Sequence, residues 1–426
     1  MKKNHILLVL ILCIWFVISF VTNITGPMLP MVITDFHLSL TLASFLPFSF
    51  FLAYGVMSVP AGMIIERYGG KTSLLAAFGF AFVGAFMFVL FPVYGVVLAS
   101  LFIIGTGMAM LQVIILPLMR EAGGKRNYAF YTVLAQVVFG SASFLSPFVL
   151  TGLLHQLVNP STESTCFIRC LKSMIPESLP WSSLYLIFTG VFALMLVLIS
   201  IIQFPKVQLR EEEKTGALQH YPILLKNKQV ILFFLGIVAY VGTEQGLANW
   251  MSQFLYDYHG VSPDESGAVT VAWFWGMITI GCLLGLLLIR LMDSRIMLRY
   301  FAVLAFINLS VALFAPANIA LIAFPCCGFF ISVMFSILFS LALNSVEKYH
   351  GAFSGILCTG IFGGAVLPFL IGWLGDWVGL RFSMTLLFVT LAYIFGLSFW
   401  AKPLVSNKTI RLKEMLSFLA RPQPKR

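Results

Sequence analysis

Long apolar runs separated by short polar stretches make up most of the chain. Twelve runs are long enough to cross a bilayer as helices, which takes about 20 apolar residues. The pattern therefore predicts an all-α polytopic membrane protein. The first run is longer than a cleavable signal, and no small-residue cleavage site follows it, so we expect it to be retained. The predicted spans are approximately 6–33, 40–65, 72–91, 93–119, 127–154, 181–204, 229–256, 263–290, 296–315, 318–345, 351–374 and 381–402.

Composition agrees with this prediction. The chain is 60% hydrophobic and 10% charged, whereas about 25% charged residues is usual for a soluble domain. The net charge of +10 is a topology signal, because all but three of the 26 basic residues fall in segments on one side of the predicted spans. The exceptions are Arg169, Lys172 and Arg381. The positive-inside rule then places both termini in the cytoplasm, and we expect a bacterial inner (plasma) membrane protein that does not bind nucleic acid.

Two similar halves are predicted, since several features repeat at an offset of 223 residues: the first and seventh spans, Gly62 with Gly285, and Arg67 with Arg290. Such offsets are typical of transporters built from internal repeats. We expect a six-helix bundle over 1–204, a cytoplasmic linker over 205–228, a second six-helix bundle over 229–402 and a basic tail over 403–426. The tail is expected to contact anionic lipid, and the protein is expected to be a monomer.

The seventh span carries the strongest candidate for chemistry. Glu244 is the one carboxylate predicted deep in an apolar segment, where a charge costs about 2.5–3.5 kcal/mol on insertion scales. Gln245 and Asn249 follow on one helical stripe, and glycines flank them. We predict that Glu244 binds the coupling proton and that Gln245, Asn249, Trp250 and Trp273 bind solute. Trp275 is expected in the interfacial aromatic belt instead.

The first half offers three amides in apolar surroundings: Asn23, Gln112 and Gln136. A buried amide without partners is costly, so each must face a wet cavity or bond another helix. One such amide is more often a link between helices. Three of them favour a shared solute site. Glycine and proline after Asn23 predict that the first span is broken or kinked there.

Other chemistry finds little support. No Cys and His spacing suggests a metal site, no cofactor motif is present, and no nucleophile–base pair or phosphate loop indicates an enzyme. Five of the seven cysteines fall within predicted spans and are expected to pack there. Cys166 and Cys170 share a predicted outer loop, and whether they form a disulfide stays open.

The loop after the second span resembles the signature of the major facilitator superfamily, Gly-x-x-x-Asp-Arg-x-Gly-Arg-Lys/Arg. Here it reads Gly62-Met-Ile-Ile-Glu66-Arg67-Tyr68-Gly69-Gly70-Lys71, with Glu66 in place of the usual Asp and Gly70 in place of the usual Arg. The resemblance implies the major facilitator fold of twelve helices in two pseudo-repeats. Charges near this loop are expected to form a cytoplasmic latch in which Glu66 caps a helix and the bases pair with acids across the two halves. The predicted latch residues are Gly62, Glu66, Arg67, Gly69, Lys71, Arg120 and Arg290.

Within that family, the chain is similar to the fucose/galactose/glucose:proton symporter branch. The similarity rests on Asn23 with Pro30, Pro60-Ala61-Gly62, Gln112 before Pro117, Ala135-Gln136 and Val241-Gly242-Thr243-Glu244. In the fucose symporter an Asp of span one and a Glu of span four serve coupling and sugar binding. The matching positions here are Gly26 and Gln112, neither of which titrates. Either Glu244 carries the proton, or sodium or no ion drives transport.

Three functions follow as hypotheses. The first is a secondary transporter of a neutral, hydroxyl-rich solute such as a sugar, because no Lys or Arg is predicted inside a span to bind an anion. The second is an exporter of cationic or amphipathic compounds, with Glu244 as counter-charge. The third is a membrane sensor or lipid handler that moves no solute and has an apolar cavity. The sugar transporter is the function that we favour from the sequence.

Overall fold

A computed structural model describes residues 2–123, 128–158, 166–176, 178–202, 204, 220–289, 291–346 and 349–401. The described residues form helices and connections without strands, and twelve helical segments are long and apolar enough to span a membrane. The predicted number of spans and the all-α fold class are therefore confirmed. Most of the predicted linker and all of the tail lie outside the described residues.

The first half of the chain contains the spans built from the first eight α-helices. Several are longer than a minimal span because they extend beyond the apolar run at one end. The elements are α1 (Lys2–Asn23), α2 (Thr25–Phe36), α3 (Leu40–Tyr68), α4 (Gly70–Leu90), α5 (Tyr94–Gly123), α6 (Tyr128–Val158), α7 (Cys166–Met174), η1 (Pro180–Ser182) and α8 (Ser183–Ile201).

The second half repeats the six-span arrangement with more interrupted helices. The short α9 (His220–Leu225) precedes it. The elements that follow are α10 (Lys228–His259), η2 (Pro263–Gly267), α11 (Ala268–Leu288), α12 (Ser294–Phe314), α13 (Ala317–Ile331), α14 (Met334–Leu343), α15 (His350–Thr359), η3 (Gly360–Phe362), α16 (Gly363–Val378), α17 (Leu380–Ser383) and α18 (Leu386–Trp400).

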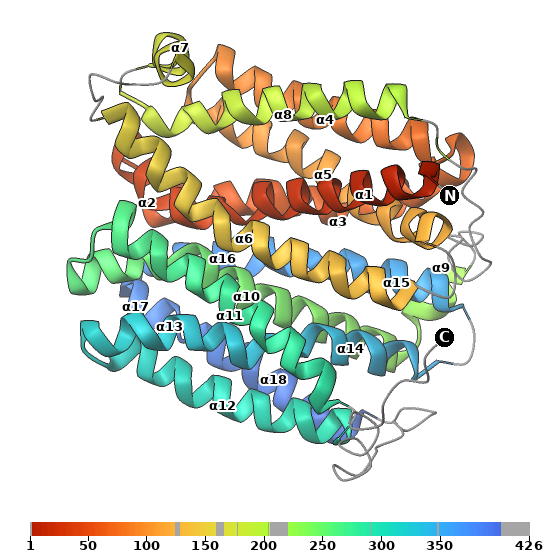
Figure 1. The fold of residues 1–426 in the computed structure, drawn as a ribbon. Coiled ribbons are helices and arrows are strands. Elements are labelled where there is room, and N and C mark those ends of the chain that lie inside the picture. The colour runs from red at the N-terminus through yellow and green to blue at the C-terminus, as the bar shows by residue number, and fades with distance from the viewer. Residues whose placement is uncertain are drawn as a thin grey trace, which may run out of the picture.

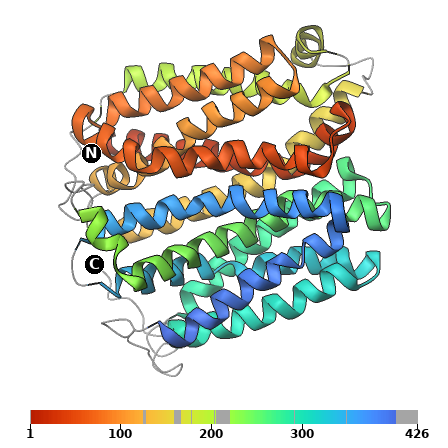
Figure 2. The same ribbon diagram turned by 180° about the vertical axis from the view of Figure 1, so that it is seen from behind.

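The two halves lie side by side as bundles, here called the N bundle (α1–α8) and the C bundle (α10–α18) (Figures 1 and 2). Contacts between the bundles come chiefly from α3 with α16, α6 with α11 and α2 with α10. α1 begins and α18 ends on the same side of the molecule (Figure 1). We call that side the terminal end and the opposite side the distal end.

The first span is broken where the sequence predicts it. α1 ends at Asn23, α2 begins at Thr25, and Ile24 between them keeps near-helical angles of φ −78° and ψ −18°. Pro27 follows in the first turn of α2, where its missing N–H costs least. The break sets Asn23 at the end of one helix, beside the interface between the bundles.

The corner between α3 and α4 depends on a glycine. Gly69 has φ 78° and ψ 165°, a backbone conformation that a side chain would strain. Lys71, two residues later, donates to the backbone oxygens of Ser200 (2.8 Å) and Ile202 (3.0 Å) at the end of α8. In this conformation Lys71 thus bonds its own bundle, and its pairing with acids across the bundles stays a prediction. The free carbonyls that end a helix attract a cation, and α8 of its own bundle provides them.

Candidate functional site

A cavity of about 380 Å³ lies between the bundles. It has a volume typical of small-molecule sites. Both bundles line it: Trp15 to Asn23 of α1 and Gln112 of α5 contribute from one side, and α10, α11 and α14 from the other. The lining continues to Ile289 and Met297, beside the connection between α11 and α12 at the terminal end. The cavity therefore runs from mid-membrane toward the terminal end.

At the distal end the bundles are packed closely. A Cβ atom added to Gly26 of α2 would lie 2.2 Å from the backbone oxygen of Ala248 in α10. One added to Gly372 of α16 would lie 2.6 Å from the backbone oxygen of Leu40 in α3. Real Cβ atoms do not approach oxygen so closely, so helices of opposite bundles come into backbone contact at these positions. The conformation is closed on the distal side and extends its cavity toward the terminal side.

Glu244 stands near the middle of α10 and lines the cavity. Every residue from Ala239 to Leu255 is buried except Glu244, which is partly exposed. The exposure comes from the cavity side, because Glu244 lines the cavity and the rest of this stretch is buried. Tyr240, one helical turn earlier, donates its hydroxyl to Glu244 Oε1 at 2.9 Å. A mid-membrane carboxyl group thus faces the cavity, held by a tyrosine of its own helix.

The cavity holds Glu244 without an opposing cation. Its described lining residues include neither Lys nor Arg. A carboxylate at membrane depth is costly unless it is paired or hydrated, and the hydrogen bond from the Tyr240 hydroxyl offsets part of that cost here. Among the described residues, no group of three His, Cys, Asp or Glu side chains lies close enough to hold a metal ion.

Four of the predicted amides line the same cavity: Asn23, Gln112, Gln136 and Gln245. Asn23 is buried and donates from Nδ2 to Ser143 Oγ at 2.8 Å, and Ser143 Oγ lies 2.6 Å from Ser19 Oγ. This chain of hydrogen bonds joins α1 to α6 inside the N bundle. Asn23 therefore combines both roles weighed from the sequence, since it bonds a neighbouring helix and borders the cavity.

Gln112 and Gln136 come from α5 and α6, whereas Gln245 comes from α10 in the opposite bundle. Gln112 is partly exposed and Gln136 is exposed, and both line the cavity. Exposed amides at this depth are satisfied by water or by a bound solute. The structure thus brings these amides of both bundles to one cavity, as their isolated polar positions predict.

Three predicted solute-binding residues lie outside the lining. Asn249 donates within its own helix to the backbone oxygen of Gln245 at 2.8 Å. Trp250 is fully buried, and its Nε1 donates to the backbone oxygen of Pro368 at 2.9 Å. Trp273 is 46% exposed and packs edge-on against Phe144, with ring centroids 5.3 Å apart. Helical rotation separates Trp250 from Glu244 on α10 and Trp273 from Trp275 on α11. Asn249 shares a face with Gln245 but lies one turn further toward the closed distal end.

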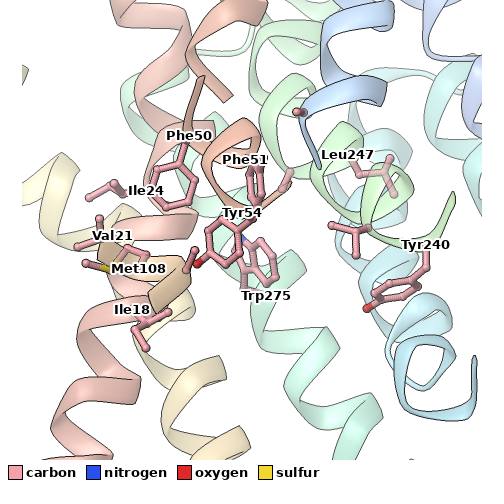
Figure 3. Close-up of a cluster of buried hydrophobic side chains, with 14 of the residues drawn as sticks. Ile18, Val21, Ile24, Phe50, Phe51, Tyr54, Met108, Tyr240, Leu247 and Trp275 are labelled. Carbon is pink, nitrogen blue, oxygen red and sulfur yellow. The ribbon is translucent and has the colours of Figure 1, made fainter. Parts of the chain in front are cut away.

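Trp275 is the tryptophan of α11 that lines the cavity, and it is 2% exposed. The prediction that Trp275 belongs to an interfacial belt is therefore wrong, since the ring is enclosed between helices. Tyr54 of α3 and Tyr240 of α10 also line the cavity, and Figure 3 shows their rings with that of Trp275. Tyr54 and Tyr240 were not predicted as site residues, although Tyr240 precedes Glu244 by one helical turn and could have been found by that spacing.

None of the described residues of the predicted latch lines the cavity. Gly62, Glu66 and Arg67 occupy the last turns of α3, and the Arg67 guanidinium lies 5.3 Å from the Tyr68 ring centroid. The side chain of Arg120 and the whole of Arg290 lie outside the described residues. The latch role of these residues stays a prediction.

Two bundles of six spans around a central cavity whose largely apolar lining includes amides and one carboxyl group are typical of membrane transporters. The sequence profile of the Major Facilitator Superfamily matches residues 11–365. The chain belongs to this superfamily, whose members are transporters and not enzymes.

Similar proteins include two kinds of bacterial transporter. A glucose/galactose transporter of Brucella abortus is 28% identical over 389 residues, covering 89% of this chain and 90% of the relative. The L-fucose-proton symporter of Escherichia coli is 24% identical over 407 residues, covering 89% of each. A crystal structure of the E. coli fucose:proton symporter FucP has a TM-score of 0.67 at 20% identity, covering 94% of this chain and 99% of that one.

A bacterial homolog of the human lysosomal transporter Spinster, in an inward-facing and unoccupied conformation, has a TM-score of 0.76 at 14% identity. The match covers 94% of this chain and 97% of that one. These structural likenesses show the shared fold, and the resemblance to the major facilitator superfamily stated from the sequence is confirmed.

Proposed function

We propose that this protein transports a neutral sugar or sugar-like solute by alternating access, coupled to protons through Glu244. The observation that carries the proposal is the position of Glu244. It is the one residue between Ala239 and Leu255 that is not buried, and it faces a cavity shared by both bundles. A proton-binding group at that place can meet water from each side in turn as the bundles rock.

The chemistry of the lining supports an uncharged, hydroxyl-rich solute. Amides from both bundles supply hydrogen-bond donors and acceptors, and Tyr54 and Trp275 supply aromatic faces. The described lining offers no base that would attract an anionic solute. The names of the relatives, a glucose/galactose transporter and an L-fucose-proton symporter, agree with this class.

Proton coupling through Glu244 fits the departures from the fucose symporter pattern. Gly26 and Gln112 stand where that resemblance places two acids, and neither residue has a titrating group. Gly26 also has no room for a side chain, because Ala248 of the other bundle touches it. Glu244 is the carboxyl group that remains at the cavity, and acids at membrane depth commonly relay protons in transporters.

The distribution of basic residues supports the orientation. With both termini in the cytoplasm of a bacterial cell, the terminal end is the inner side and the structure is open inward. Anionic lipid near the basic tail and a monomeric protein belong to the same proposal.

The function is tested by binding and flux. Thermal shifts with neutral sugars at two pH values, with and without sodium, are expected to show stabilisation by a sugar that depends on pH and not on sodium. Counterflow in proteoliposomes then measures transport of that sugar. Stabilisation by lipophilic cations but by no sugar would overturn the proposal in favour of an exporter that uses Glu244 as counter-charge. A sodium requirement would leave sugar transport standing and contradict proton coupling.

A further inference from the structure

The corner that joins α16 to α17 repeats the corner that joins α3 to α4. In each, a glycine, an acid, a second glycine and a base follow at the same spacing of four, three and two residues. The positions are Gly62, Glu66, Gly69 and Lys71 in the first corner, and Gly372, Asp376, Gly379 and Arg381 in the second.

The two corners also share their backbone. Gly379 has φ 82° and ψ 154°, close to the 78° and 165° of Gly69. Each glycine N–H bonds the carbonyl four residues earlier at 2.9 Å, from Gly379 to Gly375 and from Gly69 to Ile65. One corner lies at the terminal end of the N bundle, and the other at the distal end of the C bundle (Figure 1).

The acid of the distal corner bonds the opposite bundle. Asp376 Oδ1 accepts from the backbone N–H of Leu40 at 2.8 Å, and Asp376 Oδ2 accepts from the N–H of Thr41 at 2.9 Å. The Thr41 hydroxyl also donates to Oδ2. Leu40 and Thr41 are the first two residues of α3. Asp376 therefore caps a helix of the N bundle from the C bundle, where N–H groups lack helical partners and a negative charge is favoured.

Close packing brings the acid to this helix end. Gly372, one turn before Asp376, touches the Leu40 carbonyl through its backbone, and a Cβ there would also lie 2.7 Å from the Ser44 Cβ atom. Asp376 itself is exposed to water. Water can therefore replace its bonds when the helices separate, which is what a contact that breaks and re-forms requires.

We propose that Asp376 is the latch of the distal gate: it holds the distal ends of α3 and α16 together and must release them each time the cavity opens to the distal side. The inference rests on the alternating-access cycle proposed above. It assigns a residue to one step of that cycle. Removing a helix cap of this kind changes an equilibrium by about 2- to 30-fold, so the latch biases the gate without locking it.

A buried reporter at the gate tests the latch. Ser44 is fully buried in this conformation beside Gly372. In a full-length background whose seven cysteines are replaced, Ser44→Cys reacts with a thiol reagent only when the distal gate opens. Its reaction rate in proteoliposomes then follows the open population. Asp376→Ala is expected to raise this rate about 2- to 30-fold.

Asp257→Asn is the matched control. It changes another exposed distal acid, whose Oδ1 accepts from Gln253 Nε2 at 2.7 Å within its own helix. It is expected to leave the rate unchanged. Equal rates in Asp376→Ala and its parent would overturn the latch, as would an equal rise in the Asp257→Asn control.

A second variant removes a donor instead of the acid. Proline is well tolerated at the first position of a helix, and Ser39 before it has the extended backbone that proline requires (φ −69°, ψ 164°). Leu40→Pro deletes one N–H bonded to Asp376, and Leu40→Ala keeps it. The latch predicts a higher reporter rate for Leu40→Pro than for Leu40→Ala. Equal rates contradict it, even if Asp376→Ala fails to fold.

The reporter experiment distinguishes a wrong assignment of Asp376 from a wrong proposed function. If the latch is wrong, a transported sugar still changes the reporter rate while Asp376→Ala does not. If the proposed function is wrong, no sugar changes the rate, whereas the Asp376→Ala effect persists.

Discussion

Gly26 is the position where a single methyl group should act on the gate. An alanine Cβ there would lie 2.2 Å from the Ala248 backbone oxygen of the opposite bundle. A backbone oxygen within α10 cannot rotate aside as a side chain can. The protein can relieve the contact by separating α2 from α10, which is the direction of distal opening.

The magnitude follows from overpacking. Inserting a methyl group into a well-packed contact costs about 1–3 kcal/mol. Each ~1.4 kcal/mol is a factor of ten, so Gly26→Ala should raise the ratio of distal-open to distal-closed protein by about 5- to 150-fold. The cost falls on the closed conformation alone if the two helices move apart on opening.

Spin labels at Leu42 and Tyr256 measure the effect. Both side chains are exposed, near the distal ends of α3 and α10 in opposite bundles. Pulsed electron–electron distance measurements on full-length protein in nanodiscs should show a longer distance gaining population in Gly26→Ala.

Gly363→Ala is the control for packing alone. Its Cβ would lie 2.2 Å from the Val238 backbone oxygen, a similar contact between α16 and α10 of the same bundle. It should lower thermal stability without changing the distance distribution. An unchanged distribution in Gly26→Ala, with only a stability loss like that of Gly363→Ala, would refute the assignment of this contact to a moving interface.

Three further predictions concern the cavity and the fold. Ser143→Ala leaves the buried Asn23 Nδ2 without its acceptor, so thermal denaturation should show a loss of about 1–3 kcal/mol; no change would mean that water replaces Ser143. Trp275→Phe should weaken sugar binding about two- to tenfold in titration calorimetry, because a smaller ring offers less aromatic contact, whereas Trp273→Phe should not, and equal effects would contradict the cavity lining. Lys71→Ala should lower the melting temperature through loss of the α8 cap and leave the distribution of distances between the spin labels unchanged. A shift in that distribution would support the predicted pairing of Lys71 with acids across the bundles.

The membrane spans were predictable because the lipid bilayer restricts what can cross it. A helix that crosses lipid must satisfy its backbone internally and present apolar side chains, and both demands leave a strong signal in the sequence. The break after Asn23 was predictable for a similar reason, since Gly26 and Pro27 weaken the helix locally. The position of Glu244 at a cavity was predictable from the cost of an acid at its depth.

Which side chains of a helix point toward the cavity was harder to predict. Trp273 and Trp275 are two positions apart, and helical geometry turns them about 200° from one another. Only knowledge of which face of α11 meets the cavity separates the exposed ring from the enclosed one. Sequence alone gives the spacing but not the rotation of the helix.

Contacts between bundles were the least predictable. The bonds from Leu40 and Thr41 to Asp376 join positions far apart in the chain. Lys71, predicted to bond acids of the other bundle, donates instead to carbonyls at the end of α8 in its own bundle. Such pairings depend on the arrangement of the bundles in one conformation, which no local pattern records.

The central claim is that Glu244 couples solute movement to protons. Glu244→Gln keeps the size of the side chain and an oxygen that can accept from the Tyr240 hydroxyl, and removes only the titrating group. The control is Asp257→Asn, which changes an exposed acid on the same helix.

Uptake of a sugar that binds the wild-type protein, driven by a proton gradient in proteoliposomes, is the direct measurement. We expect Glu244→Gln to lose accumulation against a gradient while retaining exchange of sugar across the membrane, and Asp257→Asn to accumulate sugar like the wild type. Accumulation by Glu244→Gln equal to that of the wild type would contradict the account.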